Sequence, residues 1–195
     1  MGFISAKASN IVGGGGGGTG GYLSASKLGD GESCRIAILS PEPLEYWTVW
    51  GENGDQKKPF RFADEPNEQE ILQELGDFKQ RMNYEGTELE KPKFALSFFV
   101  FDYEDSKVKV FEVNQKPIIS ELDNISQQED YQVIQDWDIV ISRKGLRLQT
   151  EYKVLPAPRK KGMQNIIDAA WKEAEGKGYD LSQLMVGGSP FGETL

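Results

Sequence analysis

The chain has 195 residues, a hydrophobic content of 38% and a formal net charge of −9 at pH 7. It contains no histidine and one cysteine, Cys34, which excludes an intramolecular disulfide, a Cys/His zinc site and histidine-dependent catalysis. No stretch approaches the ~18 apolar residues of a membrane span and no leader peptide is recognisable, so we expect a cytoplasmic protein.

Residues 1–33 are predicted to form a flexible, glycine-rich N-terminal arm. Gly13 to Gly18 is an unbroken glycine run, which has no side chains to bury and a high entropic cost of ordering. The run contains the GxGxxG spacing, but the Lys-Ser/Thr of a phosphate-binding loop does not follow it. We therefore interpret it as a linker.

The folded part is expected to begin near Cys34, because residues 34–39 alternate as a strand does. Aromatic and β-branched residues recur over 45–50, and a short strand is expected over 58–62. Apolar residues at helical spacing predict a helix over 68–82. The segment 41–93 either prolongs the first strand or forms a large insertion after it.

The central segment gives the fold class. Two strands, 94–103 and 107–113, are joined by the tight polar turn 104–106. A helix with an apolar stripe follows Pro117, and two more strands are expected over 137–142 and 146–155. This order predicts a mainly β fold with helices over 34–158: an OB-fold five-stranded barrel with a helix between strands 3 and 4.

The last part of the chain, 159–195, is predicted to be a helix and a tail. Apolar residues at helical spacing indicate an amphipathic helix over 163–175, and Gly176 offers a stop. Beyond it, the glycine-containing tail is expected to be flexible and to expose Phe191.

Charge is distributed in blocks along the sequence. The block 143–161 holds seven cations against the single carboxylate of Glu151. OB barrels bind single-stranded nucleic acid on strands 2 and 3 and on the loop between strands 4 and 5. That loop is the basic turn here, so the first candidate binding residues are Arg143, Lys144, Arg147, Tyr152 and Lys153. The alternative is that basic and acidic blocks merely pair with each other across a solvated surface.

A second set of candidates comes from strand periodicity, which places alternate residues on opposite faces. We expect Phe98 and Val100 to face the core, with Phe94 and Leu96. The other face would then offer Phe99, Phe101 and Tyr103 for stacking, beside Lys107 and Lys109 on the next strand. The competing interpretation is that these strand aromatics are buried. Further candidates are Trp47, Trp50, Lys57, Lys58, Phe60 and Arg61.

Catalysis has little support in the sequence. Two carboxylate pairs, Asp102 with Glu104 and Asp136 with Asp138, could in principle hold a metal ion or exchange protons. Nothing supplies a nucleophile with an activating partner, so we expect neither enzymatic activity nor a cofactor.

The segment KPKFALSFFVFDYEDSKVKVFEVNQKPIISEL, followed by WDIVISRKGLRLQTEYKVLPAP, resembles phage-encoded single-stranded DNA-binding proteins with an OB fold. The resemblance covers roughly 34–158. It implies a protein in the cytoplasm of the host bacterial cell that coats exposed single-stranded DNA, without sequence preference, during replication, recombination and repair. It also implies replication or recombination proteins as partners of the C-terminal tail, and homo-oligomers among the possible assemblies. The T4-type relatives carry a zinc site, which this chain lacks the ligands to build.

A different class of function is compatible with the same residues. The chain could be a protein-binding phage adaptor, structural or regulatory, that uses the same barrel with its acidic surfaces facing a partner. The glycine-rich arm would suit that role by threading across a neighbour in an oligomer.

Overall fold

The computed structural model describes residues 21–192, which form nine strands and three α-helices. They fall into two compact units. Unit 1 comprises Tyr46–Phe94 and overlaps the expected insertion at 41–93. Unit 2 combines Tyr22–Glu45 with the chain from Ala95 onward.

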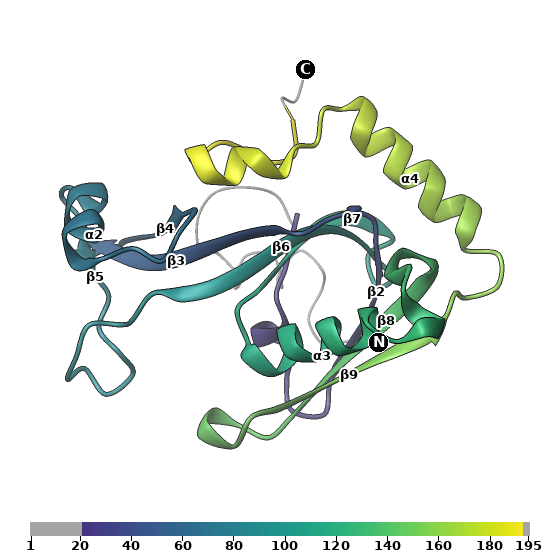
Figure 1. The fold of residues 1–195 in the computed structure, drawn as a ribbon, viewed down its shortest axis with the longest axis horizontal. Helices are drawn as coiled ribbons and strands as arrows, with labels where there is room; N and C mark the ends of the chain where they lie inside the picture. The colour runs from purple at the N-terminus through teal and green to yellow at the C-terminus, as the bar shows by residue number, and fades with distance from the viewer. Residues whose placement is uncertain (1–20, 193–195) are drawn as a thin grey trace. The chain divides into compact units, whose positions relative to one another are not determined.

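Unit 2 is built on six strands that lie in one sheet (Figure 1). They are β1 (Tyr22–Leu23), β2 (Ser33–Ile38), β6 (Lys93–Asp102), β7 (Lys107–Val113), β8 (Trp137–Lys144) and β9 (Glu151–Pro158). Their spatial order is β1-β7-β6-β2-β8-β9. The order β8-β2-β6-β7 within it is a Greek key, because the fourth of these strands along the chain returns beside the first.

The sheet of unit 2 is open. Within residues 21–192, no ladder joins β9 back to β7, so the sheet does not close into the expected five-stranded barrel. Instead, the far edge of β7 pairs in parallel with β1, and Tyr22 lies opposite Val110. The segment that follows contains η1 (Ala25–Lys27), and Ala25 is buried. Residues 22–33, expected as part of the arm, therefore belong to this unit, while the glycine run 13–18 lies outside the described residues.

The main core of unit 2 lies between the sheet and α3 (Lys116–Ser126). Pro117 stands in the first helical turn, as expected, where a missing N–H costs nothing. The stripe Ile118, Leu122 and Ile125 packs against Phe98 and its neighbours on the sheet. Two short turns, η2 (Glu129–Tyr131) and η3 (Ile134–Asp136), lead from α3 into β8.

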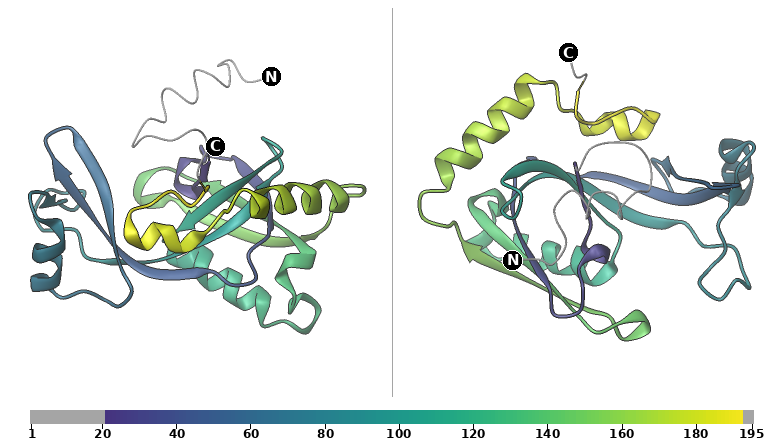
Figure 2. Two further views of the ribbon diagram at one scale, coloured as in Figure 1. Left: turned by 90° about the horizontal axis from the view of Figure 1, so that it is seen from above. Right: turned by 180° about the vertical axis from the view of Figure 1, so that it is seen from behind.

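The opposite face of the sheet is covered by the C-terminal segment. It consists of α4 (Gln164–Gly176) and η5 (Leu181–Val186), drawn in yellow-green and yellow (Figures 1 and 2). The expectation of a tail with an exposed Phe191 is wrong. The Phe191 ring is half-buried, with its centroid 5.2 Å from that of Tyr22 and 5.4 Å from that of Tyr179.

Unit 1 is a small sheet covered by one helix. Its elements are β3 (Leu44–Asn53), β4 (Gln56–Phe62), α2 (Glu68–Leu75) and β5 (Lys79–Gln80). Asn67 caps α2 through a capping box with Glu70. The prediction that this helix runs to Met82 is wrong beyond Leu75, because the chain turns at Gly76 with a φ of +55°.

No helix within residues 21–192 is both long and apolar enough to cross a membrane.

Candidate nucleic-acid interface

The basic block forms a long antiparallel hairpin. β8 and β9 pair from Trp137 opposite Pro158 to Lys144 opposite Glu151, and η4 (Arg147–Gln149) makes the loop. Lys144, Arg147 and Lys153 are exposed at this end of the hairpin. Among residues 21–192, none of the three forms an ion pair. The hairpin therefore presents three cations to solvent.

Arg143 has a different role from its neighbours. Its guanidinium donates hydrogen bonds to the carbonyl oxygens of Ser26 at 2.9 Å and Leu28 at 2.6 Å. The Arg143 backbone also pairs with Gly31 and Glu32, which precede β2. Arg143 thus anchors the segment before β2 to the hairpin, and its guanidinium is engaged inside the protein.

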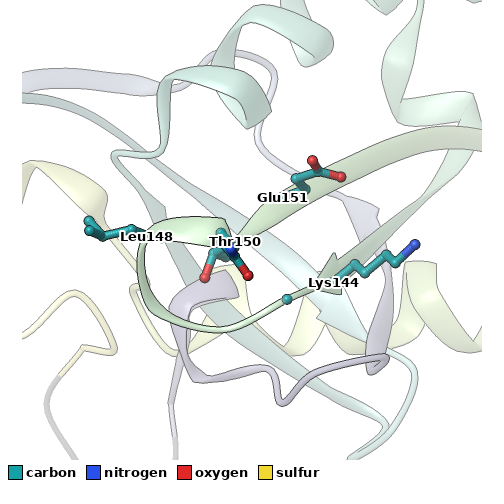
Figure 3. Close-up of a pocket in the computed structure, with 6 residues that line it drawn as sticks. Lys144, Leu148, Thr150 and Glu151 are labelled. Carbon is teal, nitrogen blue, oxygen red and sulfur yellow. The ribbon is translucent and has the colours of Figure 1, made fainter.

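The hairpin loop is tightly built and carries exposed leucines. Gly145 has a φ of +82°, and a Cβ at this position would lie 2.1 Å from the carbonyl oxygen of Gln149. Its N–H donates to Asp30 Oδ1 at 2.7 Å. Leu146 and Leu148 are 63% and 96% exposed, and Figure 3 shows Leu148 pointing outward, away from Lys144. A shallow hollow beside the loop is lined by Lys144, Gly145, Leu148, Gln149, Thr150 and Glu151.

Tyr152 and Lys153 lie on opposite faces of β9. Tyr152 is half-buried against the main core, whereas Lys153 is exposed on the other side of the strand. Of the two, Lys153 is therefore the one available to a ligand, because the Tyr152 ring already packs against apolar neighbours.

The aromatic face of β6 is buried, which corrects the expectation of an exposed stacking surface. Phe98 and Val100 face the main core as predicted. On the opposite face, Phe99 and Phe101 are only 3% and 0% exposed. The C-terminal segment covers them: Trp171, Tyr179 and Leu184 pack on Phe99, and Ile167 packs on Phe101.

Tyr103, the third aromatic of this face, is half-buried in a polar cluster. Its hydroxyl donates to Asp138 Oδ1 at 2.9 Å. Burial, followed by the bond to Asp138, raises the pKa of the Tyr103 hydroxyl. The Arg35 guanidinium and the Lys160 ammonium lie 5.4 and 5.0 Å from the ring centroid. The ring is thus already in contact with two cations.

Lys107 and Lys109 do not share a face with these aromatics, which is a second correction. Lys107 lies opposite Asp102 and Lys109 opposite Val100, so both point to the face of Phe98. Lys109 is buried and forms ion pairs with Asp102, at 2.7 Å, and with Asp105. Burial lowers the pKa of Lys109, but the hydrogen bonds to the two carboxylates outweigh it and leave that pKa raised. Lys107 is exposed.

Three of the remaining candidates pack within unit 1 on the side of α2. Phe60 belongs to the core of the unit, with Val49 and Ile71, and is therefore unavailable for stacking. The Lys58 ammonium lies 4.5 Å from the Phe60 ring centroid. Trp47 contacts Phe94 edge-to-face, at 5.7 Å between centroids.

The other three lie on the opposite face of the β3–β4 ladder, as the register shows. Trp50 is half-buried opposite Pro59. Lys57 pairs with Glu52 at 3.3 Å, and the Arg61 guanidinium lies 5.3 Å from the Tyr46 ring. Within unit 1, the six candidates are thus divided between two faces and do not form one surface.

One carboxylate of each pair considered for catalysis is engaged in ion pairs. Asp102 pairs with Lys109, as described above. Asp138 is fully buried and accepts from Arg35 at 2.7 Å and from Arg159 at 2.8 Å. Two guanidinium groups on one carboxylate leave a net positive charge at this point of the sheet.

Arg35 and Lys160 were absent from the predicted set, although the sequence carried a signal for each. Arg35 is the outward-facing cation of the alternating strand 34–39, and Lys160 belongs to the basic block 143–161. Their meeting on the Tyr103 ring depends on long-range packing that no local pattern encodes.

Comparison with known proteins gives one relevant similarity. Over 84 residues the chain is 36% identical to a protein of Escherichia phage T5 with the name "Probable ssDNA-binding protein". The aligned part is 43% of this chain but 32% of the phage T5 protein, so the chain matches about one third of that protein's length. No family model matches the chain. No solved structure matches it either.

Proposed function

We propose that the protein binds single-stranded DNA without sequence preference and without enzymatic activity. Its role would be to coat and protect single-stranded DNA exposed during phage DNA replication, recombination and repair. The observation that carries this proposal is the β8–β9 hairpin, which presents Lys144, Arg147 and Lys153 free of ion pairs among the described residues of a chain with net charge −9. Cations that are gathered at one site and have no ion-pair partner can bind the phosphate backbone of DNA.

The topology of unit 2 supports the proposal. We assign β2, β6, β7, β8 and β9 as the five strands of an OB-type fold, with α3 between the third and fourth. The OB-fold is a Greek-key barrel that is often partly open, and the order β8-β2-β6-β7 is a Greek key. In this assignment the β8–β9 loop joins strands 4 and 5, which is one of the loops through which OB-folds bind oligonucleotides.

The phage T5 similarity supports the same conclusion independently of topology. The name of that protein describes single-stranded DNA binding, and the aligned residues are about two fifths of this chain. The replication and recombination setting is the further step that we propose on this basis.

The test is binding of fluorescein-labelled oligo-dT, measured by anisotropy across a series of salt concentrations. We expect salt-dependent binding to oligo-dT and much weaker binding to a duplex of equal length. Replacing Lys144, Arg147 and Lys153 by alanine should lower the salt slope by roughly two, at about 0.7 per phosphate contact. Arg143 is left unchanged because its loss would disturb the anchor of the hairpin.

The competing function is a protein-binding adaptor. One observation favours it: Asp123 in the last turn of α3, and Glu129, Asp130 and Asp136 between α3 and β8, are all exposed. A complete lack of oligo-dT binding at low salt would reject the DNA-binding proposal and leave the adaptor.

A further inference from the structure

We propose that single-stranded DNA follows the outer face of β2, β8 and β9, which is the face opposite the main core. It would not follow the same face of β6 and β7. This inference rests on the proposed function and adds a path for the strand. The path is a set of residues that we call the outer strip, and none of them carries a negative charge. The outer strip consists of Ser33, Arg35, Val140, Ser142, Lys153 and Leu155.

The face of β6 and β7 is occupied by the protein itself. Phe99 and Phe101 on β6 and Val110 on β7 are at most 3% exposed beneath α4 and η5. A strand of DNA would reach these side chains only after the C-terminal segment had left. That step would expose a large apolar surface to water, which is unfavourable.

The outer strip lies on the same side of the sheet, but beyond the cover. The register places Ser33 opposite Ser142 and Ser142 opposite Lys153, which gives one row across three strands. A second row runs from Arg35 through Val140 to Leu155. Neighbouring rows lie about 7 Å apart along the strands and neighbouring strands about 4.8 Å apart, so the six side chains form a continuous surface.

The side chains of the outer strip are accessible. Leu155 is 47% exposed, and Ser33 and Lys153 are also exposed. Arg35, Val140 and Ser142 are half-buried, so they form the less exposed part of the surface beside Ser33, Lys153 and Leu155. The outer strip offers aliphatic surface and hydroxyl groups to bases, and none of its residues is aromatic.

Electrostatics favours an anion along this route. Two carboxylates lie on the face of the outer strip. Asp138 is fully buried and shared by Arg35 and Arg159, so two cations face one anion. Glu151 is exposed opposite Lys144 and forms no ion pair within residues 21–192, and the cations along the path outnumber these two carboxylates. Lys160 is exposed next to Arg35 and Arg159, against the Tyr103 ring. Lys153 continues the positive charge toward Lys144 and Arg147 at the hairpin loop. The cations thus run from Lys160 to the loop.

The decisive comparison uses two charge-reversed double variants. The pair Lys153→Glu and Lys160→Glu changes the proposed path. The control pair, Lys107→Glu and Lys116→Glu, makes the same change in net charge at two exposed lysines away from it: Lys107 at the start of β7 and Lys116 at the start of α3. Urea unfolding of each variant confirms that the folded state is retained.

We expect the first pair to weaken oligo-dT binding at least about tenfold and to lower the salt slope by about 1.4, the value for two lost phosphate contacts. The control pair should stay within about threefold of the parent, as distant surface charges are largely screened. If the parent protein binds oligo-dT but the control pair loses as much affinity as the first pair, the path is wrong while the proposed function stands. If the parent does not bind, the function itself is wrong.

Hydrogen exchange with and without oligo-dT gives a second readout that does not depend on substitutions. We expect slower exchange in Ser142–Leu155 and unchanged exchange in α4 and η5. Faster exchange in α4 and η5 on adding DNA would show that the C-terminal segment is displaced, and would overturn the path across the outer strip.

Discussion

The Arg143 guanidinium donates a hydrogen bond of 2.6 Å to the carbonyl oxygen of Leu28, joining residues 115 positions apart in the sequence. The bond holds the segment that enters β2 against the hairpin. Arg143 and Arg147 therefore look alike in the sequence but differ in role, and that difference is open to test.

Replacing Arg143 by alanine should lower the free energy of unfolding by about 2 kcal/mol, because the carbonyl oxygens of Ser26 and Leu28 lose a charged donor. Urea denaturation followed by tryptophan fluorescence measures the change. Arg147→Ala is the control, and it should stay within about 0.5 kcal/mol because Arg147 is exposed. Equal effects of the two substitutions would contradict the anchoring role of Arg143.

Gly145 and Gly162 form a matched pair for the hairpin loop. Both have a positive φ, +82° and +79°, but only Gly145 has a backbone atom in the way of a Cβ. Gly162→Ala should cost about 1 kcal/mol for the left-handed backbone alone. Gly145→Ala should cost a further 1–3 kcal/mol, roughly, because the Cβ meets the Gln149 carbonyl. Thermal or urea unfolding of the two variants gives the difference, and no difference would mean that the loop relaxes freely.

Lys109 should matter for stability and not for DNA. Lys109→Ala leaves the buried Asp102 carboxylate without its ion-pair partner, and we expect a loss of about 3–5 kcal/mol in unfolding free energy. Lys107→Ala, two residues away and exposed, should change stability by less than about 0.5 kcal/mol. The prediction fails if Lys109→Ala unfolds at the same urea concentration as the parent.

Cys34 gives a prediction about pH. Burial, followed by the nearby Asp102 charge, raises the pKa of the Cys34 thiol from 9.0 to about 11. Because the folded state holds the proton more tightly, the contribution of Cys34 to stability is fully present below pH 9 and is lost as the pH rises toward 11. Between pH 8 and pH 10, roughly 1 kcal/mol of it should disappear.

The measurement is the unfolding free energy of the parent minus that of Cys34→Ala at each pH, which cancels the titration of other groups. A difference that stays constant from pH 8 to pH 10 would contradict the raised pKa. The native thiol should also react slowly with a disulfide reagent at pH 8, since the thiolate is the reactive form.

Periodicity was enough to predict the core face of β6, since alternation alone places Phe98 and Val100 together. It could not show what lies on the other face. Phe99 and Phe101 are covered by residues of α4 and η5, more than 60 positions further along the chain. The sequence of a strand with an aromatic face does not indicate whether DNA or a helix covers that face.

The prediction that Lys107 and Lys109 lie on the face of Phe99 and Phe101 is wrong because the register between β6 and β7 cannot be read from the sequence. The turn after Asp102 sets Val108, and not a lysine, opposite Phe101. A shift of one residue exchanges the two faces of a strand, so a register set by one turn decides which side a cation takes. Ser106, with a φ of +53°, lies in that turn.

The C-terminal segment covers Phe99 and also brings Phe191 to Tyr22, at 5.2 Å between ring centroids. This late cover has a consequence for the order of folding during synthesis. The ribosome makes β1 and β6 first, whereas the residues of α4 and η5 that cover Phe99 are translated more than 60 positions later. Until then the outer aromatic face of β6 is open to water and to other nascent chains. A stall or truncation shortly before α4 would therefore leave an incomplete molecule that is prone to aggregation, even though the main core beneath α3 already has all of its residues.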